Sequence, residues 1–156
     1  MNNKQAIKAL RAANAVAAKA KAVGRHPFGA VLIAPDGETI LLEAGNEGTV
    51  RHAETELARA ASEKFTSDYL WQCTLATNFE PCVMCTGTIY WANIGRIVYG
   101  AAESALLGLT GNHEENPTLD LPCRDVVKTG PKTIDIMGPF EEVKAEVLEL
   151  HRDFWK

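Results

Sequence analysis

Long uninterrupted runs of apolar residues are missing from this sequence of 156 residues. The alanine-rich stretch at residues 1–24 is broken by five lysines and arginines, so it has neither the apolar centre of a signal peptide nor the length of a membrane span. Internal repeats and low-complexity tracts are also missing. These absences predict a soluble, cytoplasmic protein without a membrane partner, and the length predicts a single domain over residues 1–156.

An excess of positive charge is missing as well. The chain has 16 lysines and arginines against 20 aspartates and glutamates, a net charge of −4, and its basic residues are scattered among acidic ones. A protein that neutralises many phosphates needs a basic face. We therefore expect no nucleic-acid partner and a small-molecule substrate.

Cysteine is scarce, with four residues in the chain. In a secreted protein they could form disulfides, but in the reducing compartment that we expect, metal binding is the better interpretation of Cys82-x-x-Cys85. Cys73 lies in an apolar run and is expected to be a small core residue. Cys123 follows a proline in a predicted loop and is given no role.

The pattern of apolar residues predicts an alternation of helices and strands. Strands are expected at residues 28–34, 39–44, 73–78, 96–100 and 133–137. Helices are expected at residues 4–23, from 51 or 52 to about 64, 81–92 and 140–155, with a short one near 103–109. The long connection at 101–132 permits the last two strands to run parallel. The expected fold class is α/β, with a five-stranded mixed sheet and helices on both faces.

Two short motifs carry the chemistry: His52-Ala53-Glu54 and Pro81-Cys82-Val83-Met84-Cys85. One imidazole and two thiolates are zinc ligands, and three protein ligands with an open fourth position are typical of catalytic zinc. Cys82 and Cys85 share one face in the first turn of a helix, where unpaired N–H groups favour thiolates. His52 and Glu54 are two residues apart and can converge only off a helix tip. The sequence therefore predicts two helix N-termini aimed at one zinc ion per chain, with Glu54 as general acid and base.

The combination of H-x-E and P-C-x-x-C resembles the zinc-dependent cytidine and deoxycytidylate deaminase superfamily, over nearly the whole chain. The resemblance implies a three-layer α/β/α cytidine deaminase-like fold and hydrolytic removal of an amino group from a nitrogen heterocycle, with release of ammonia. In this interpretation, water activated by zinc attacks the amino-bearing ring carbon, and Glu54 moves the protons. The resemblance also implies at least a homodimer, for which Tyr90 and Trp91 are interface candidates.

Three further stretches resemble bacterial guanine deaminases: His-Pro-Phe-Gly-Ala-Val at 26–31, Ile-Tyr-Trp-Ala at 89–92 and Ala-Ala-Glu at 101–103. Guanine is therefore the leading substrate, although residues 108–115 lack the Gly-Phe-Asp-Asp stretch of that branch. The substrate-binding candidates that the resemblance implies are Phe28, Asn46, Ala53, Glu80, Trp91 and Glu103. The ordinary alternatives are a core role for Phe28 and Trp91 and a turn role for Asn46.

Other functions stay open. Cytosine, a nucleoside, a pterin or an s-triazine could replace guanine, and the rival classes are a tRNA adenosine deaminase and a non-enzymatic zinc module. Glu54 argues against the module, because a purely structural site needs no acid there. The tail at residues 141–156 holds five acidic and three basic side chains, which argues against a tRNA-binding face.

The reacting ring has to be shielded from bulk water. Two segments could cover it: residues 101–132, or the end of the last helix. In the second case Phe154 and Trp155 would contact the substrate, either in their own chain or swapped into a neighbouring subunit. We expect these two aromatic residues to project from a helix end that is free to swing.

Overall fold

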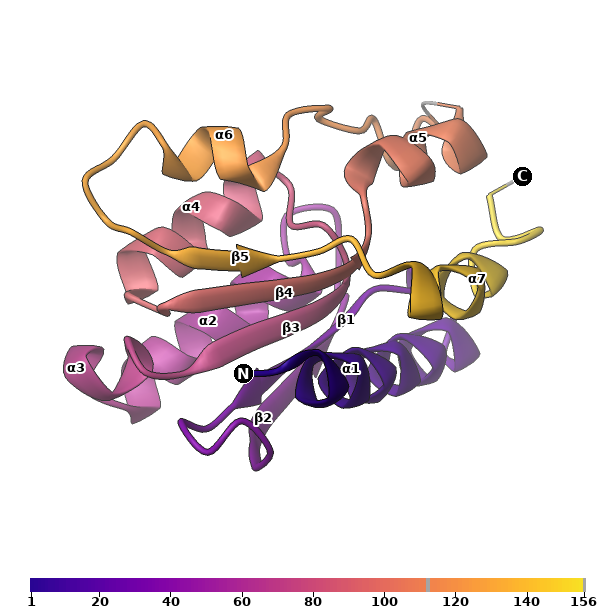
Figure 1. Ribbon diagram of the computed structural model, residues 1–156. Helices are drawn as coiled ribbons and strands as arrows, with labels where there is room; N and C mark the ends of the chain where they lie inside the picture. The colour runs from indigo at the N-terminus through magenta and orange to yellow at the C-terminus, as the bar shows by residue number, and fades with distance from the viewer. Residues whose placement is uncertain (112, 156) are drawn as a thin grey trace.

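The computed structural model describes residues 1–111 and 113–155, and a five-stranded sheet with the order β2-β1-β3-β4-β5 lies at its centre (Figure 1). Strand β1 (Gly29–Ile33) pairs antiparallel with β2 (Ile40–Gly45) and with β3 (Thr74–Phe79). Strands β3, β4 (Arg96–Ala101) and β5 (Asp135–Met137) run parallel. The predicted mixed sheet is confirmed, including the parallel pairing of the last two strands.

Helices cover both faces of the sheet, which confirms the predicted three layers (Figure 1). On one face lie α1 (Asn3–Ala22) and α7 (Glu141–Glu149). On the other lie α2 (Ala53–Lys64), α4 (Val83–Ala92) and α6 (Cys123–Val127). The apolar residues of β1 alternate between the two layers, and because both faces are covered, the whole strand is buried.

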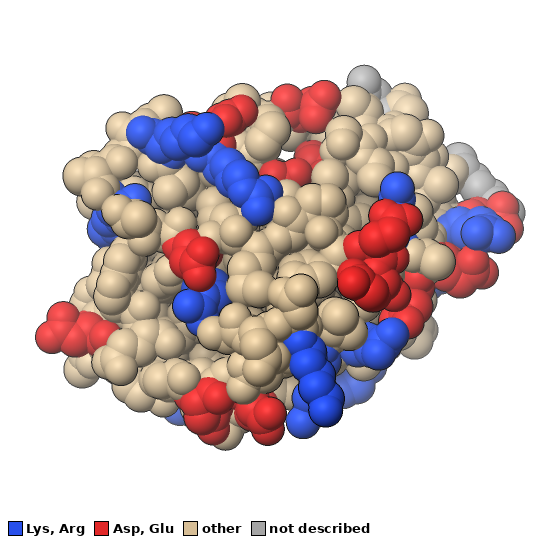
Figure 2. All heavy atoms as spheres, in the orientation of Figure 1, with Lys and Arg blue, Asp and Glu red and all other residues tan. Residues whose placement is uncertain are grey.

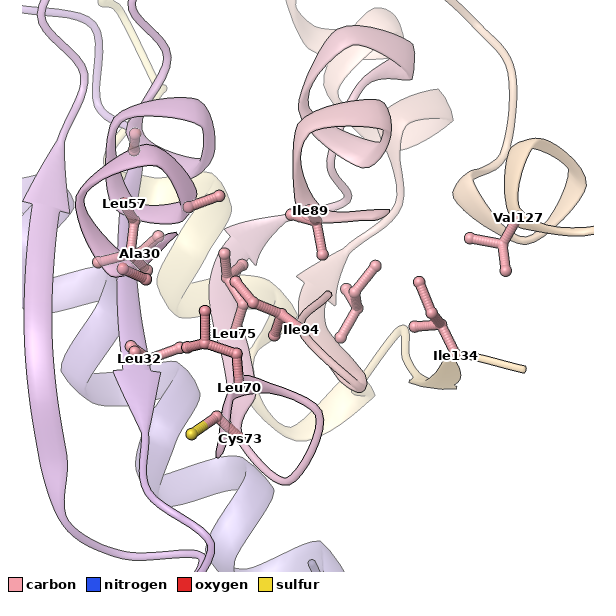
Figure 3. Close-up of a cluster of buried hydrophobic side chains, with 14 residues drawn as sticks. Ala30, Leu32, Leu57, Leu70, Cys73, Leu75, Ile89, Ile94, Val127 and Ile134 are labelled. Atoms are coloured by element: carbon pink, nitrogen blue, oxygen red, sulfur yellow. The ribbon is translucent and has the colours of Figure 1, made fainter. Parts of the chain in front are cut away.

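The larger buried cluster joins the sheet to α2 and α4 (Figure 3). It contains Leu57 from α2, Leu75 from β3 and Ile89 from α4. Packing of this kind sets the positions of α2 and α4 against the same strands, so the N-termini of the two helices are placed relative to each other by the core. Those N-termini carry the two motifs that the sequence singles out.

Gly29 permits a close approach between β1 and α1. A Cβ atom at this position would lie 2.4 Å from both the carbonyl oxygen of Ala13 and the amide nitrogen of Ala17, which is impossible without moving the backbone. The glycine therefore lets α1 lie directly on the strand that follows Phe28.

The main differences from the sequence prediction lie in short helices and at the chain end. The sequence does not predict α3 (Ser67–Leu70), and it places Cys123 in a loop although this residue begins α6. Helix α7 ends at Glu149 rather than continuing to residue 155; further along, Asp153 adopts a left-handed backbone conformation with φ of 60°, in which no α-helix can continue. No helix in the described part of the chain combines the length and apolarity needed to cross a membrane.

His151, just beyond α7, is buried and holds the chain end against the segment before β1. Its Nε2 donates to the Pro27 carbonyl at 2.8 Å, and its Nδ1 accepts from the Trp155 indole N–H at 3.0 Å. Each ring nitrogen therefore has one partner, and this pattern requires the neutral imidazole. Burial is the main cause that lowers the pKa of His151 to about 4, with smaller contributions from the charges of Lys21 and His26.

The pKa of His151 predicts a loss of stability in weak acid. The unfolded chain takes up a proton near pH 6.5, whereas the folded chain does so only near its pKa of about 4, so stability falls as the pH drops between these values. We expect His151 to contribute a loss of about 2 kcal/mol between pH 7.5 and pH 5.0. Urea unfolding of the wild type and of His151→Phe at both pH values measures this loss of unfolding free energy. Acid release of the metal affects both proteins equally, so the difference between them reports His151. Equal pH dependence in the two proteins would show that His151 is not held neutral.

Candidate metal centre

The two sequence motifs meet at the N-termini of α2 and α4. His52 is the residue before α2 and Cys82 the residue before α4, and both have extended backbone conformations. Cys85 follows in the first turn of α4. The Nδ1 atom of His52 lies 3.6 Å from the Cys82 sulfur and 3.4 Å from the Cys85 sulfur, and the two sulfurs are 3.5 Å apart. These atoms form a compact triangle suited to one metal ion.

The size of the triangle matches zinc. Tetrahedral zinc with Zn–N and Zn–S bonds of about 2.0 and 2.3 Å would set its ligand atoms roughly 3.5–3.8 Å apart. The observed separations of 3.4–3.6 Å agree with this within a few tenths of an ångström. Among the described residues, these three form the one histidine, cysteine and carboxylate cluster with this metal-binding geometry. Three ligands leave one of the four positions open.

The two thiols differ in acidity. The hydrogen bond with Cys85, followed by that with His52, lowers the pKa of Cys82 to about 4. The same contact, together with burial, raises the pKa of Cys85 well above its usual value. One thiolate therefore exists before any metal binds, and the second has to lose its proton to the metal. Binding of zinc should release protons and weaken in acid.

Glu54 lies beside the triangle, in the first turn of α2. Its side chain is buried, with Oε2 at 3.5 Å from the Cys85 sulfur and Oε1 accepting a hydrogen bond of 2.6 Å from the Thr77 hydroxyl. Burial raises the pKa of Glu54, and the Thr77 hydroxyl partly opposes this rise. A carboxyl with a raised pKa next to a metal site can both accept and return a proton.

The metal triangle opens into two cavities that share part of their walls. We call the first the inner cavity; its volume is about 30 Å³, enough for a water-sized molecule. It is lined by Phe28, His52, Glu54, Phe79, Glu80, Cys82, Glu103, Leu106 and Asn116. The second, the outer cavity, has a volume of about 410 Å³ and also touches His52, Cys82, Glu103 and Asn116. A heterocycle is larger than the inner cavity, so only its reacting edge fits there without movement of the walls.

Three of the predicted substrate-binding residues line the inner cavity: Phe28, Glu80 and Glu103. Burial, followed by the nearby negative charges, raises the pKa of Glu103 to about 9. Asn46 is buried behind Phe28, and its backbone N–H donates to the Phe28 carbonyl at 3.1 Å. Ala53 is the first residue of α2, directly after His52, and is also buried.

The structure corrects the expectation for Trp91. Its side chain is 82% exposed at the far end of α4 from Cys82 and lines surface grooves, not the inner or the outer cavity. Helix geometry explains the error, because the ten residues of α4 span about 15 Å. This position lies too far along the helix to reach the site of the same chain.

The chain end also differs from its prediction. Phe154 and Trp155 line neither the inner nor the outer cavity, and their rings pack against His26, with centroid distances of 5.8 and 4.6 Å. Trp155 is further held by its hydrogen bond to His151. In this structure the two aromatic residues therefore pack beside His26 and not over the cavities. Of the two candidate lids, the described part of residues 101–132 lines the cavities, through residues such as Asn116, whereas Phe154 and Trp155 do not.

Sequence reasoning missed four residues that complete the site: Thr77, Phe79, Leu106 and Asn116. Thr77 could have been noticed, because it is a polar residue inside an apolar strand, between the two motifs. The other three give no such signal. In particular, the polarity of residues 111–122 does not reveal that Asn116 lines both cavities.

Comparison with known proteins agrees with this geometry. Residues 3–101 match the cytidine and deoxycytidylate deaminase zinc-binding region. The chain belongs to this zinc-binding deaminase family. The match contains both motifs and all three atoms of the metal triangle, so the residues that the geometry brings together are those of a deaminase.

Relatives in this family act on different substrates. A probable cytosine deaminase of Schizosaccharomyces pombe is 34% identical over 150 residues, which cover 94% of this chain and 90% of the relative. A tRNA-specific adenosine deaminase of Haemophilus influenzae is 37% identical over 101 residues, covering 62% of this chain and 58% of the relative. The structure of a guanine deaminase from Nitrosomonas europaea superimposes with a TM-score of 0.70 at 21% identity, over 96% of this chain and 82% of that one. The last comparison concerns the fold alone.

The Thr77 hydroxyl predicts a change in the pH dependence of deamination. Glu54 has to be ionised to accept the first proton, and the hydrogen bond from Thr77 lowers its pKa. Thr77→Val removes this bond at constant shape, so the acidic limb of the kcat/KM profile should move to higher pH. Thr74→Val, in the same strand, is the control, because Thr74 is buried but does not contact Glu54. If the acidic limb of the kcat/KM profile is unchanged in Thr77→Val while zinc is retained, the limb does not report the ionisation of Glu54.

Proposed function

We propose that this protein hydrolyses the amino group of a free nucleobase, releasing ammonia, with cytosine and guanine as the two leading substrates. The observation that carries the proposal is the meeting of His52, Cys82, Cys85 and Glu54 at one end of a cavity walled by Phe28 and Phe79. The zinc ligands provide for activation of water, the glutamate provides for proton transfer, and the aromatic rings suit a flat heterocycle.

Each protein group has a defined task in this reaction. When bound, zinc supplies a Lewis acid that lowers the pKa of water. Glu54 accepts a proton from the attacking water and passes it to a ring nitrogen, which makes the amino-bearing carbon electrophilic. It then carries the second proton to the departing amine. The hydroxyl of Thr77 holds the Glu54 carboxylate in place at 2.6 Å, and Phe28 and Phe79 shield the ring from bulk water.

The charge around the site favours a neutral substrate over a phosphorylated one. Two exposed glutamates, Glu114 and Glu115, line the outer cavity, and no lysine or arginine is among its described lining residues. Figure 2 shows acidic side chains, with basic ones beside them, around a hollow near the top of the molecule. Phosphates would meet like charge at this entrance. This argues for a free base over a nucleotide or a tRNA.

Four observations bear on the choice between cytosine and guanine. Cytosine is favoured by the relative that matches nearly the whole of both chains. It is also the smaller ring, which suits an inner cavity of about 30 Å³. Guanine is favoured by the stretches at 26–31, 89–92 and 101–103, and the outer cavity of about 410 Å³ has room for a second ring. We place cytosine first, because its support comes from the full length of the chain.

We further propose that the protein forms a homodimer through the outer surface of α2 and α4. Trp91 lies in a groove of about 450 Å³ that also includes Ala58, Gly87 and Met84. A tryptophan that is 82% exposed beside small residues is a candidate for burial by a partner. Met84 also lines the outer cavity, so a second copy bound here would lie beside the entrance to the substrate.

Ammonia release from a panel of bases tests the reaction directly. We expect cytosine to be turned over with the highest kcat/KM, guanine next, and a tRNA anticodon stem not at all. Glu54→Gln should keep the fold and the zinc but lose about two to four orders of magnitude in kcat, because an amide cannot carry protons. Normal turnover by Glu54→Gln, or tRNA as the best substrate, would contradict the proposal.

Sedimentation at micromolar concentration tests the dimer. Trp91→Glu should shift the protein to a monomer, since it introduces a charge at the centre of the proposed interface. Trp71→Glu is the matched control: Trp71 is 39% exposed but does not line the groove. A monomeric wild type, or dissociation by both variants alike, would argue against this interface.

A further inference from the structure

The side chain of Glu80 joins two helix N-termini. One oxygen accepts a hydrogen bond of 3.1 Å from the backbone N–H of Glu103, the first residue of α5 (Glu103–Thr110). The other accepts one of 2.9 Å from the backbone N–H of Cys123, the first residue of α6. Glu80 is only 5% exposed, so water does not compete strongly for its carboxylate. Buried hydrogen bonds to a carboxylate are stronger than neutral ones.

The two bonded amides lie at the two ends of one segment. We call residues 103–111 and 113–123 the covering segment; Figure 1 shows α5 and α6 along the top of the molecule, on either side of its middle part. The covering segment supplies Glu103, Leu106 and Asn116 to the inner cavity. It also supplies most of the outer cavity, from residues 114 to 119. One buried side chain therefore holds both ends of the wall that faces the metal triangle.

The middle of the covering segment contacts the chain end and the segment before β1. The ring of His113 lies 5.5 Å from that of Trp155, and the carboxylate of Glu115, a side chain that is 63% exposed, lies 3.7 Å from the imidazole of His26. An exposed pair of this kind contributes little, because water and salt screen it. A ring that enters the inner cavity has to displace part of the wall, since that cavity holds only a water-sized molecule. The structure thus combines ends that are held by a buried carboxylate with a middle whose contact through Glu115 is exposed.

We propose that Glu80 is a positioning residue: its carboxylate clamps both ends of the covering segment and thereby sets the affinity for the substrate. The inference rests on the proposed function only in that a ring has to bind under this segment, and it does not depend on which base is used. Glu80 does not take part in the proton transfers. Its loss should therefore weaken binding more than it slows the chemical step.

Glu80→Gln tests the clamp at constant shape. A glutamine has one accepting oxygen and one NH₂ group, so it can hold one helix N-terminus but faces the other with a donor. We expect KM to rise about tenfold while kcat stays within about threefold, with zinc content unchanged. Amide hydrogen exchange of the substrate-free protein should become about tenfold faster at residue 103 or residue 123. The exchange measurement needs no substrate, so it decides the structural claim even if no tested base is deaminated.

Cys123→Pro removes the same bond from the opposite side. Proline suits the first position of a helix and lacks the N–H, and Pro122 already has the extended conformation that precedes a proline. Cys123→Ala is the control, because it trims the same buried side chain but keeps the N–H. We expect Cys123→Pro to reproduce the rise in KM, Cys123→Ala to stay near the wild type, and the double variant with Glu80→Gln to be little worse than the stronger single variant.

Three outcomes would overturn the clamp. The first is wild-type exchange and wild-type KM in both Glu80→Gln and Cys123→Pro. The second is a loss of kcat without a change in KM, which would place Glu80 in the chemical step. The third is equal behaviour of Cys123→Pro and Cys123→Ala, which would assign the effect to side-chain packing. If one of Glu80→Gln and Cys123→Pro fails to fold, the other still tests the clamp, because each removes the bond between the Cys123 N–H and Glu80 by changing a different partner.

Discussion

The site depends on one constraint: the N-termini of α2 and α4 have to point at the same place. Each helix follows a strand of the sheet, β2 and β3, and each packs on that sheet through the same buried cluster. Because the core fixes both helices, the Nδ1 atom of His52 comes within 3.6 Å of the Cys82 sulfur. A metal site with this origin does not have to be organised by the metal.

The same constraint explains why Glu54 can act beside the metal triangle. Within the first turn of α2, its buried carboxylate lies beside the triangle, while β3 supplies the Thr77 hydroxyl that holds it. The walls follow from the sheet as well, since Phe28 and Phe79 lie next to β1 and at the end of β3. The remaining wall comes from the covering segment, whose two ends donate backbone hydrogen bonds to the carboxylate of Glu80. Rigid elements thus carry the chemistry, and the covering segment forms the wall that faces it.

Much of this could be predicted from sequence, and the limits have physical causes. Apolar residues recur with the period of a strand or a helix because one side of each element is buried, so their pattern locates β1 to β5 and the long helices. The spacing of H-x-E and C-x-x-C is set by the geometry of metal ligands, so it predicts the metal triangle. Residues 103–127 are harder to predict: a short helix is expected near 103–109, where α5 lies, but α6 has no periodic signal, and the first residue of each helix bonds a buried side chain far away in sequence. The direction of an aromatic side chain depends on long-range packing, which the sequence does not show, so Trp91, Phe154 and Trp155 lie away from the cavities where they are expected.

X-ray absorption at the zinc edge of the purified protein shows directly whether the two helices meet at a catalytic metal. We expect one zinc per chain, with two sulfur ligands at about 2.3 Å and two lighter ligands at about 2.0–2.1 Å, one of them histidine. Replacing His52 should remove one light ligand, and replacing Cys85 should remove one sulfur. A centre with three or four sulfurs, or a protein that binds no zinc while folded, would contradict the convergence of the two helices on a catalytic metal.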